Sequence, residues 1–234
     1  MAFSASLRSP AGWGARLERR AAALVVRPLF WVLVVAAGVA VPVVNQVRRA
    51  PAPPLPTLGT LPDFRLTDQD GRSFGAADLR GKVWVAGFIF TRCPTICPAI
   101  TARMGKIQHR ARGIEQDFRL VSFSVDPAYD TPERLGEYAR AHRISPRMWK
   151  LLTGSLEAVK GTVEEGLKIA MGSPVGENDF ASLFHGTHFV LVDRELRIRG
   201  YYDSSAPDVE DRLLHDATML INTSVPPPGP SRGE

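Results

Sequence analysis

The fold is decided by residues 83–98, VWVAGFIFTRCPTICP, in which a continuous apolar run leads into two cysteines. Residues 83–90 are apolar at both alternating positions, which is typical of a strand buried on both faces of a sheet. Cys93 and Cys97 are the only cysteines in the chain, and their spacing is C-x-x-x-C. A thiol pair between a buried strand and a following helix indicates either disulfide chemistry or the binding of a soft metal ion.

The charge of the chain is concentrated at its N-terminus. Residues 1–50 hold seven arginines and one glutamate, so the remaining residues are close to neutral although the whole chain carries a net charge of +5. We therefore expect no basic face for nucleic acid. The length of 234 residues indicates one domain with appendages.

Residues 29–44, LFWVLVVAAGVAVPVV, carry no charge and follow an arginine-rich leader, residues 1–28. With three more residues at the interface, the segment 29–47 is predicted to be a transmembrane anchor. The excess of arginine before it places the leader in the cytoplasm and the rest of the chain on the exported, periplasmic-type side of the membrane. A cleaved signal peptide is the alternative. In either case the thiols meet an oxidising compartment.

The segments around the globular domain are rich in proline. Residues 48–62 contain five prolines and are expected to form a semi-rigid tether. The globular domain is predicted to cover residues 63–223. The last residues, 224–234, are expected to be disordered.

The pattern within the domain predicts alternating strands and helices. An Asp-Gly pair between residues 64–67 and 72–74 indicates a hairpin. Further strands are expected at 83–90, 119–125, 149–152, 187–193 and 197–202, helices at 98–112, 131–142, 156–166 and 208–222, and a long loop at 168–183. This order predicts an α/β fold with one mixed sheet: a thioredoxin-like fold with an N-terminal β-hairpin and a loop insertion, preceded by one transmembrane helix.

Two thiolates prefer a soft ion, which is Cu(I), or zinc when more ligands are present. A copper site favours a third ligand, and imidazole suits both oxidation states of copper. Three of the five histidines, His109, His142 and His215, lie on predicted surface helices. His185 and His188 lie instead at the start of a late buried strand, which in a thioredoxin-like sheet is beside the cysteine loop. Thiol oxidoreductases of that fold normally carry a cis-proline there, and this chain has no proline between residues 174 and 207.

Three segments resemble the Sco/SenC family of copper chaperones for cytochrome oxidase assembly. They are residues 88–98 (FIFTRCPTICP), residues 123–132 (FSVDPAYDTP), and His185 followed by residues 189–193 (FVLVD). The resemblance implies that Cys93, Cys97 and His185 bind copper, as Cu(I) or Cu(II). It also implies delivery of that copper to the binuclear copper site of cytochrome c oxidase subunit II. Gly186 departs from the family pattern, in which serine or threonine often follows the histidine.

Several alternatives remain open from the sequence. His188 is a second candidate for the imidazole ligand, and Asp126 either tunes the site or caps a turn. The cysteine pair also allows a thiol–disulfide oxidoreductase, in which Cys93 and Cys97 close a disulfide bond. A peroxidase of this fold would need threonine at the position of Phe90. An electron-transfer protein with its own binuclear copper site would need histidine at the position of Thr101.

Overall fold

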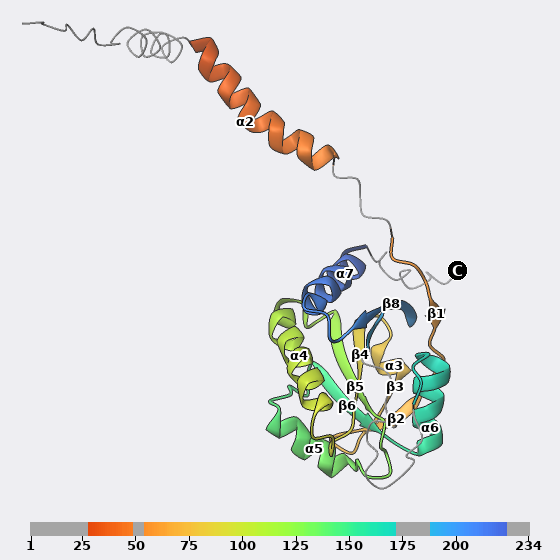
Figure 1. Cartoon of the computed structure of the whole chain (residues 1–234). Helices are drawn as coiled ribbons and strands as arrows, with labels where there is room; N and C mark the ends of the chain where they lie inside the picture. The colour runs from red at the N-terminus through yellow and green to blue at the C-terminus, as the bar shows by residue number, and fades with distance from the viewer. Residues whose placement is uncertain (1–27, 49–53, 172–187, 224–234) are drawn as a thin grey trace, which may run out of the picture. The chain divides into compact units, whose positions relative to one another are not determined.

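The computed structural model describes residues 28–48, 54–171 and 188–223 (Figure 1). The chain divides into two units, Met1–Pro54 and Leu55–Glu234, which are described separately. The predicted leader and tail, together with most of the predicted long loop, lie outside the described residues.

The first unit contains one described helix, α2 (Pro28–Arg48), which overlaps the predicted anchor. Among the described residues, no helix reaches the combination of length and apolar character that crossing a bilayer demands. The transmembrane anchor predicted at residues 29–47 is therefore not supported by the structure.

The second unit is built on a mixed sheet of eight described strands. Their order across the sheet is β1-β8-β7-β4-β5-β6-β2-β3. The strands are β1 (Gly59–Thr60), β2 (Arg65–Asp68), β3 (Ser73–Gly75), β4 (Val83–Ile89), β5 (Phe118–Ser124), β6 (Trp149–Thr153), β7 (His188–Val192) and β8 (Arg197–Asp203). The neighbours β4, β5 and β6 are parallel to one another, and β7 runs antiparallel to β4.

The local sequence explains the strands at the centre and at one edge of the sheet. Every residue of β4 is buried, as its apolar character at both alternating positions predicts. The predicted hairpin is confirmed as the pair β2–β3. Its turn uses Gly71 at φ 74°, and the carboxylate of Asp68 accepts hydrogen bonds from the backbone N–H groups of Asp70 and Arg72.

The predicted tether contributes a strand to the sheet. β1 lies within residues 48–62 and pairs with β8. The guanidinium of Arg199 on β8 also donates to the carbonyls of Leu55 and Pro56. These contacts extend the globular unit back to Leu55, because β8 would otherwise be an unpaired edge strand.

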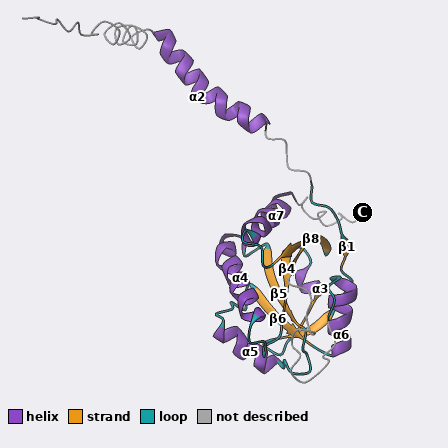
Figure 2. Ribbon diagram, in the orientation of Figure 1, coloured by secondary structure: helices purple, strands orange, loops and turns teal. Residues whose placement is uncertain are grey.

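The helices cover the two faces of the sheet. The described helices of the domain are α3 (Ala76–Leu79), α4 (Ile96–Arg110), the 3-10 turn η1 (Ala111–Ile114), α5 (Pro132–Ala141), α6 (Leu156–Lys160) with the π-helical turn η2 (Gly161–Gly166), and α7 (Val209–Thr223). Helices α4, α5 and α7 lie on one face and α6 on the other (Figure 2). The predicted cap of α5 is confirmed, since the Thr131 side chain accepts from the Arg134 N–H and Pro132 takes the first helical position.

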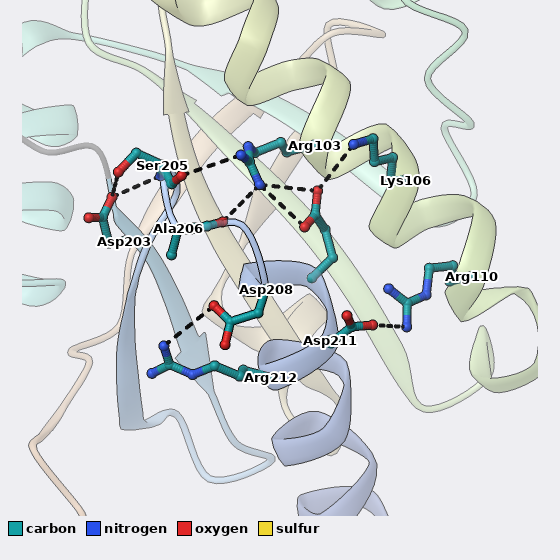
Figure 3. A network of polar contacts seen from close by, with 10 residues as sticks. Arg103, Lys106, Arg110, Asp203, Ser205, Ala206, Asp208, Asp211 and Arg212 are labelled. Carbon is teal, nitrogen blue, oxygen red and sulfur yellow. Dashed lines mark hydrogen bonds and ion pairs between the residues drawn. The ribbon is translucent and has the colours of Figure 1, made fainter.

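Ion pairs fix the second half of α4 to the start of α7 (Figure 3). The carboxylate of Glu210 is mostly buried and lies 3.3 Å from Arg103 and 3.6 Å from Lys106. Arg103 also donates to the Ala206 carbonyl at 3.0 Å. The helix that follows the cysteine loop is thus fixed to α7 by partly desolvated charges, which are screened less than exposed ones.

Candidate metal centre

The two cysteines lie at the point where β4 ends and α4 begins. Cys93 precedes the helix, and Cys97 is its second residue. The backbone N–H of Cys97 donates to the Sγ atom of Cys93 at 3.4 Å, so the first sulfur lies over the first turn of α4. Both are free thiols, with 7% and 0% of their surface exposed. The structure thus brings the predicted pair together.

The surroundings of the two thiols give them different pKa values. Burial opposes the charged form of Cys93, but hydrogen bonds from the backbone N–H groups of Cys97, Thr95 and Ile96 outweigh it and lower the pKa of Cys93. Burial raises the pKa of Cys97 well above its usual value, and the negative charge of a neighbouring Cys93 thiolate adds to that effect. Cys93 is therefore the more acidic of the two thiols, and Cys97 the less acidic.

Two carboxylates from the loop after β5 hold the residues that precede Cys93. Asp130 is fully buried and accepts hydrogen bonds from the backbone N–H and the hydroxyl of Thr91, and from the Ser124 hydroxyl at 2.6 Å. Asp126 forms an ion pair of 2.6 Å with the guanidinium of Arg92. The sequence suggested that Asp126 either tunes the site or caps a turn. The structure adds a third role, an ion pair with Arg92 of the cysteine loop.

Aromatic side chains complete the surroundings of the loop. The guanidinium groups of Arg92 and Arg134 lie 4.8 and 3.9 Å from the centre of the Tyr129 ring, within the range of a cation–π contact. The Tyr138 hydroxyl is 2.7 Å from the Thr101 hydroxyl. Burial raises the pKa of Tyr138 to about 12, with a contribution from the nearby cysteines. Tyr138 therefore stays neutral beside the thiols.

Sequence reasoning missed several of these partners. It gave no role to Asp130, Thr91 or Tyr138. Asp130 did stand in the quoted segment FSVDPAYDTP, directly before the helix cap. A carboxylate so close to a cap looks like part of the cap, and only the fold brings it to the cysteine loop.

The histidine positions are partly described. β7 is antiparallel to β4, with Ala86 opposite Val190, so its first residues lie at the end of the sheet where β4 leads into the cysteine loop. His188 is the first residue of β7 and is half-buried. His185, the predicted ligand, falls in residues 172–187, outside the described part of the chain. Within the described ranges, no three side chains of the His, Cys, Asp and Glu types gather as a metal-binding group.

The remaining histidines lie on helices, as predicted. His109 is in the last turn of α4 and exposed, and His215 is exposed on α7. His142 is the C-cap residue of α5, and its ring lies tilted by 39° against the Tyr138 ring, with 4.2 Å between the ring centres. None of the three joins the cysteines in a metal-binding group of the described residues.

A buried thiol pair between a central strand and a helix, in a mixed sheet with helices on both faces, defines a thioredoxin-like thiol protein. The sequence profile of the SCO1/SenC family matches residues 55–221. The chain belongs to this family.

Individual relatives agree with that assignment. The SCO1 protein homolog of Bacillus subtilis is 33% identical over 154 residues, which are 65% of this chain and 78% of the relative. A putative copper-binding protein of Stutzerimonas stutzeri is 32% identical over 154 residues, or 63% and 71% of the two chains. The solved structure of BsSco, described as having a disulfide switch and as a member of the Sco family of cytochrome c oxidase assembly proteins, is 30% identical. It covers 74% of this chain and all of its own, with a TM-score of 0.65.

Proposed function

We propose that the chain binds copper through the sulfurs of Cys93 and Cys97 and the imidazole of His185. We propose further that it delivers this copper to the binuclear copper site of cytochrome c oxidase subunit II. The observation that carries the proposal is the contact between the two cysteines, in a buried loop at the end of the sheet where β7 begins. Two sulfurs and one imidazole form a ligand set that suits copper.

The names of the relatives support copper as the bound metal and cytochrome c oxidase assembly as the process. The Stutzerimonas stutzeri protein is named as copper-binding, and BsSco belongs to a family of cytochrome c oxidase assembly proteins. The unequal acidity of the thiols supports binding in two steps. Cys93 supplies the first thiolate, and Cys97 gives up its proton only when a cation takes its place.

Copper titration of the full chain tests the ligand set. We expect about one copper ion per chain, with a sulfur-to-copper charge-transfer band in the Cu(II) form. Cys93→Ser, Cys97→Ser and His185→Ala should each lose that band. The matched control is His188→Ala, which removes the imidazole at the first residue of β7. If His185→Ala keeps copper and its spectrum while His188→Ala loses both, the ligand is His188.

The recipient is tested by transfer to the soluble copper domain of an oxidase subunit II. We expect copper to leave the loaded chain and to appear in the acceptor with the acceptor's own spectrum. The control is the same amount of copper supplied as a free ion with a competing chelator. Transfer no faster from the loaded chain than from the chelator would remove subunit II as the recipient.

Attachment to a membrane, with the domain on the exported side, is part of this proposal and rests on the sequence of residues 29–47 and the arginines before it. Fractionation of cells that express the full chain tests it, with a chain that starts at Leu55 as the control. Recovery of the full chain in the soluble fraction, like the control, would contradict membrane attachment.

A thiol–disulfide oxidoreductase is the second candidate, because both thiols are free and one has a lowered pKa. In this reaction Cys93 and Cys97 form one disulfide, and their two electrons and two protons reduce a disulfide of the partner. Turnover of a disulfide substrate by the copper-free chain, lost in Cys93→Ser and unchanged in His185→Ala, would favour this function over copper delivery.

A further inference from the structure

Three cations gather at the end of the sheet opposite the cysteine loop. Lys82 precedes β4, Arg119 is the second residue of β5, and Arg147 lies two residues before β6. These strands are parallel, so their first residues meet at one end of the sheet. Together with Glu115 and Gln116, the three cations line a pocket of about 250 Å³, which we call the cationic pocket.

None of the three cations of this pocket forms an ion pair with a carboxylate of the described residues, although the charges of Glu115 and Asp117 act on Arg119. Lys82 donates to the Gln116 carbonyl at 2.8 Å, and Arg119 donates to the carbonyls of Glu115 and Phe118. Elsewhere a half-buried cation finds carboxylates, as Lys150 does 2.7 Å from Asp68. Backbone carbonyls carry no net charge, so Glu115 is the only group of the described pocket lining that offsets the positive charge.

The charge count of the pocket is positive. Glu115 is the single carboxylate in its lining, against three cations. Asp117 lies nearby but forms an ion pair with Arg194 at 3.1 Å. Burial lowers the pKa of the Arg119 guanidinium, although Glu115 and Asp117 act in the opposite direction. A cation that has lost part of its hydration without gaining an ion pair is stabilised by an anion that enters beside it.

We propose that the cationic pocket binds a phosphate group. Two guanidinium groups and one ammonium group offer many N–H donors, and guanidinium geometry matches phosphate oxygens. Lys82 and Arg119 use only some of their donors on carbonyls, and Arg147 forms no hydrogen bond or ion pair with the described residues. The surplus of two positive charges fits a phosphate better than a single carboxylate. The volume leaves room for a small organic group on the phosphate.

Two sources supply this chemistry: free phosphate or a small phosphomonoester, and the headgroup of an anionic phospholipid. The pocket lies at the far end of the sheet from Cys93 and Cys97, so the proposal does not depend on copper binding. Its failure would leave the metal centre untouched.

Equilibrium dialysis of the full chain against inorganic phosphate tests the proposal, at constant ionic strength kept with chloride. We expect saturable binding that weakens about tenfold in Arg147→Gln, whose side chain forms no hydrogen bond or ion pair with the described residues. Arg119→Gln should weaken it as well. The matched control is Arg112→Gln, an exposed arginine of η1 outside the pocket lining, which should bind phosphate like the parent chain.

A second probe identifies the source. Glycerophosphoglycerol, the headgroup of an anionic phospholipid, should bind more tightly than inorganic phosphate if the pocket takes a lipid headgroup, and less tightly if it takes free phosphate. Both results support the pocket, provided that Arg147→Gln weakens the binding. No saturable binding of either probe, or equal binding by Arg147→Gln and Arg112→Gln, would overturn the proposal.

Discussion

The charged groups at the two ends of the central parallel strands differ in whether they are paired. At the thiol end, Arg92 pairs with Asp126, and the buried Asp130 is saturated by hydrogen bonds from Thr91 and Ser124. At the opposite end, Lys82 and Arg119 donate to backbone carbonyls, and none of the three pocket cations forms an ion pair with a described residue, although Glu115 lines the pocket. The same strands thus present a loop whose polar groups satisfy one another and a pocket whose charge is left for a ligand.

The largest effect should come from breaking the thiol end at Asp130. Asp130→Ala leaves the Thr91 N–H, the half-buried Thr91 hydroxyl and the buried Ser124 hydroxyl without an acceptor, and should lower the free energy of unfolding by about 3 kcal/mol. Urea unfolding measures the change. The control is Asp63→Ala, which removes an exposed ion pair with Arg80 and should cost about 0.5 kcal/mol or less. Equal effects of the two substitutions would refute the structural role of Asp130.

Loss of the neighbouring guanidinium should cost less. Arg92→Ala leaves the mostly buried carboxylate of Asp126 without its ion-pair partner and should lower the free energy of unfolding by about 1.5 kcal/mol. The double variant with Asp126→Ala should cost less than the sum of the two single changes, because the two side chains interact. If the two single changes in unfolding free energy add up to that of the double variant, the 2.6 Å ion pair between Arg92 and Asp126 contributes nothing to stability.

A smaller effect should appear in the pH dependence of stability, where two buried carboxyl groups act with opposite sign. Burial raises the pKa of Asp130 above its ordinary value near 3.8. The folded state then holds a proton that the unfolded state has released, so this group lowers stability as pH rises from about 4 through the raised pKa. Asp130→Asn should remove that decline in unfolding curves measured at increasing pH, and an unchanged slope would contradict the assignment.

Asp68 provides the opposite case. Burial alone would raise its pKa, but hydrogen bonds from Lys150 and from the backbone N–H groups of Arg72 and Asp70 lower it below the ordinary value. The unfolded state then takes up the proton first, so this stabilisation is present above about pH 4 and is lost as pH falls through the lowered pKa. Asp68→Asn should make acid unfolding shallower, and the reverse result would exclude the Lys150 contact as its cause.

The smallest effect is expected at the opposite end of the sheet. Arg147→Gln removes a cation from a group of like charges and breaks no described ion pair, so the free energy of unfolding should change by less than about 0.5 kcal/mol. Urea unfolding of this variant beside Arg92→Ala gives the contrast between the two ends directly. A loss as large as that of Arg92→Ala would mean that the pocket cations are structural.

The order of the elements was predictable because local patterns determine them. The buried strand before Cys93, the Asp-Gly turn at Gly71 and the threonine cap of α5 are all confirmed. Contacts between distant segments were not predictable. The tether forms β1 only because β8 offers an open edge, and α4 begins at Ile96, two residues before the predicted start.

In the candidate site, too, local features were predictable and contacts between distant residues were not. The cysteine pair could be found because its spacing is local and thiols are rare in this chain. The bonds from Asp130 to Thr91 and from Asp126 to Arg92 join residues that are 39 and 34 positions apart. One sequence contains no signal for such pairs. The cationic pocket combines residues from three strand starts, and no spacing in the sequence links them.

The unequal depth of the two sulfurs gives the cysteine loop an inside and an outside. Cys93 has 7% of its surface exposed and Cys97 has none, so a ligand from solution contacts the sulfur of Cys93 before that of Cys97. The copper ion that we propose for this loop would therefore bind Cys93 before Cys97 and leave in the reverse order. Because Cys97 is fully buried, access to the cysteine loop is from the Cys93 side, and a bond to the Cys97 sulfur forms after the bond to the Cys93 sulfur.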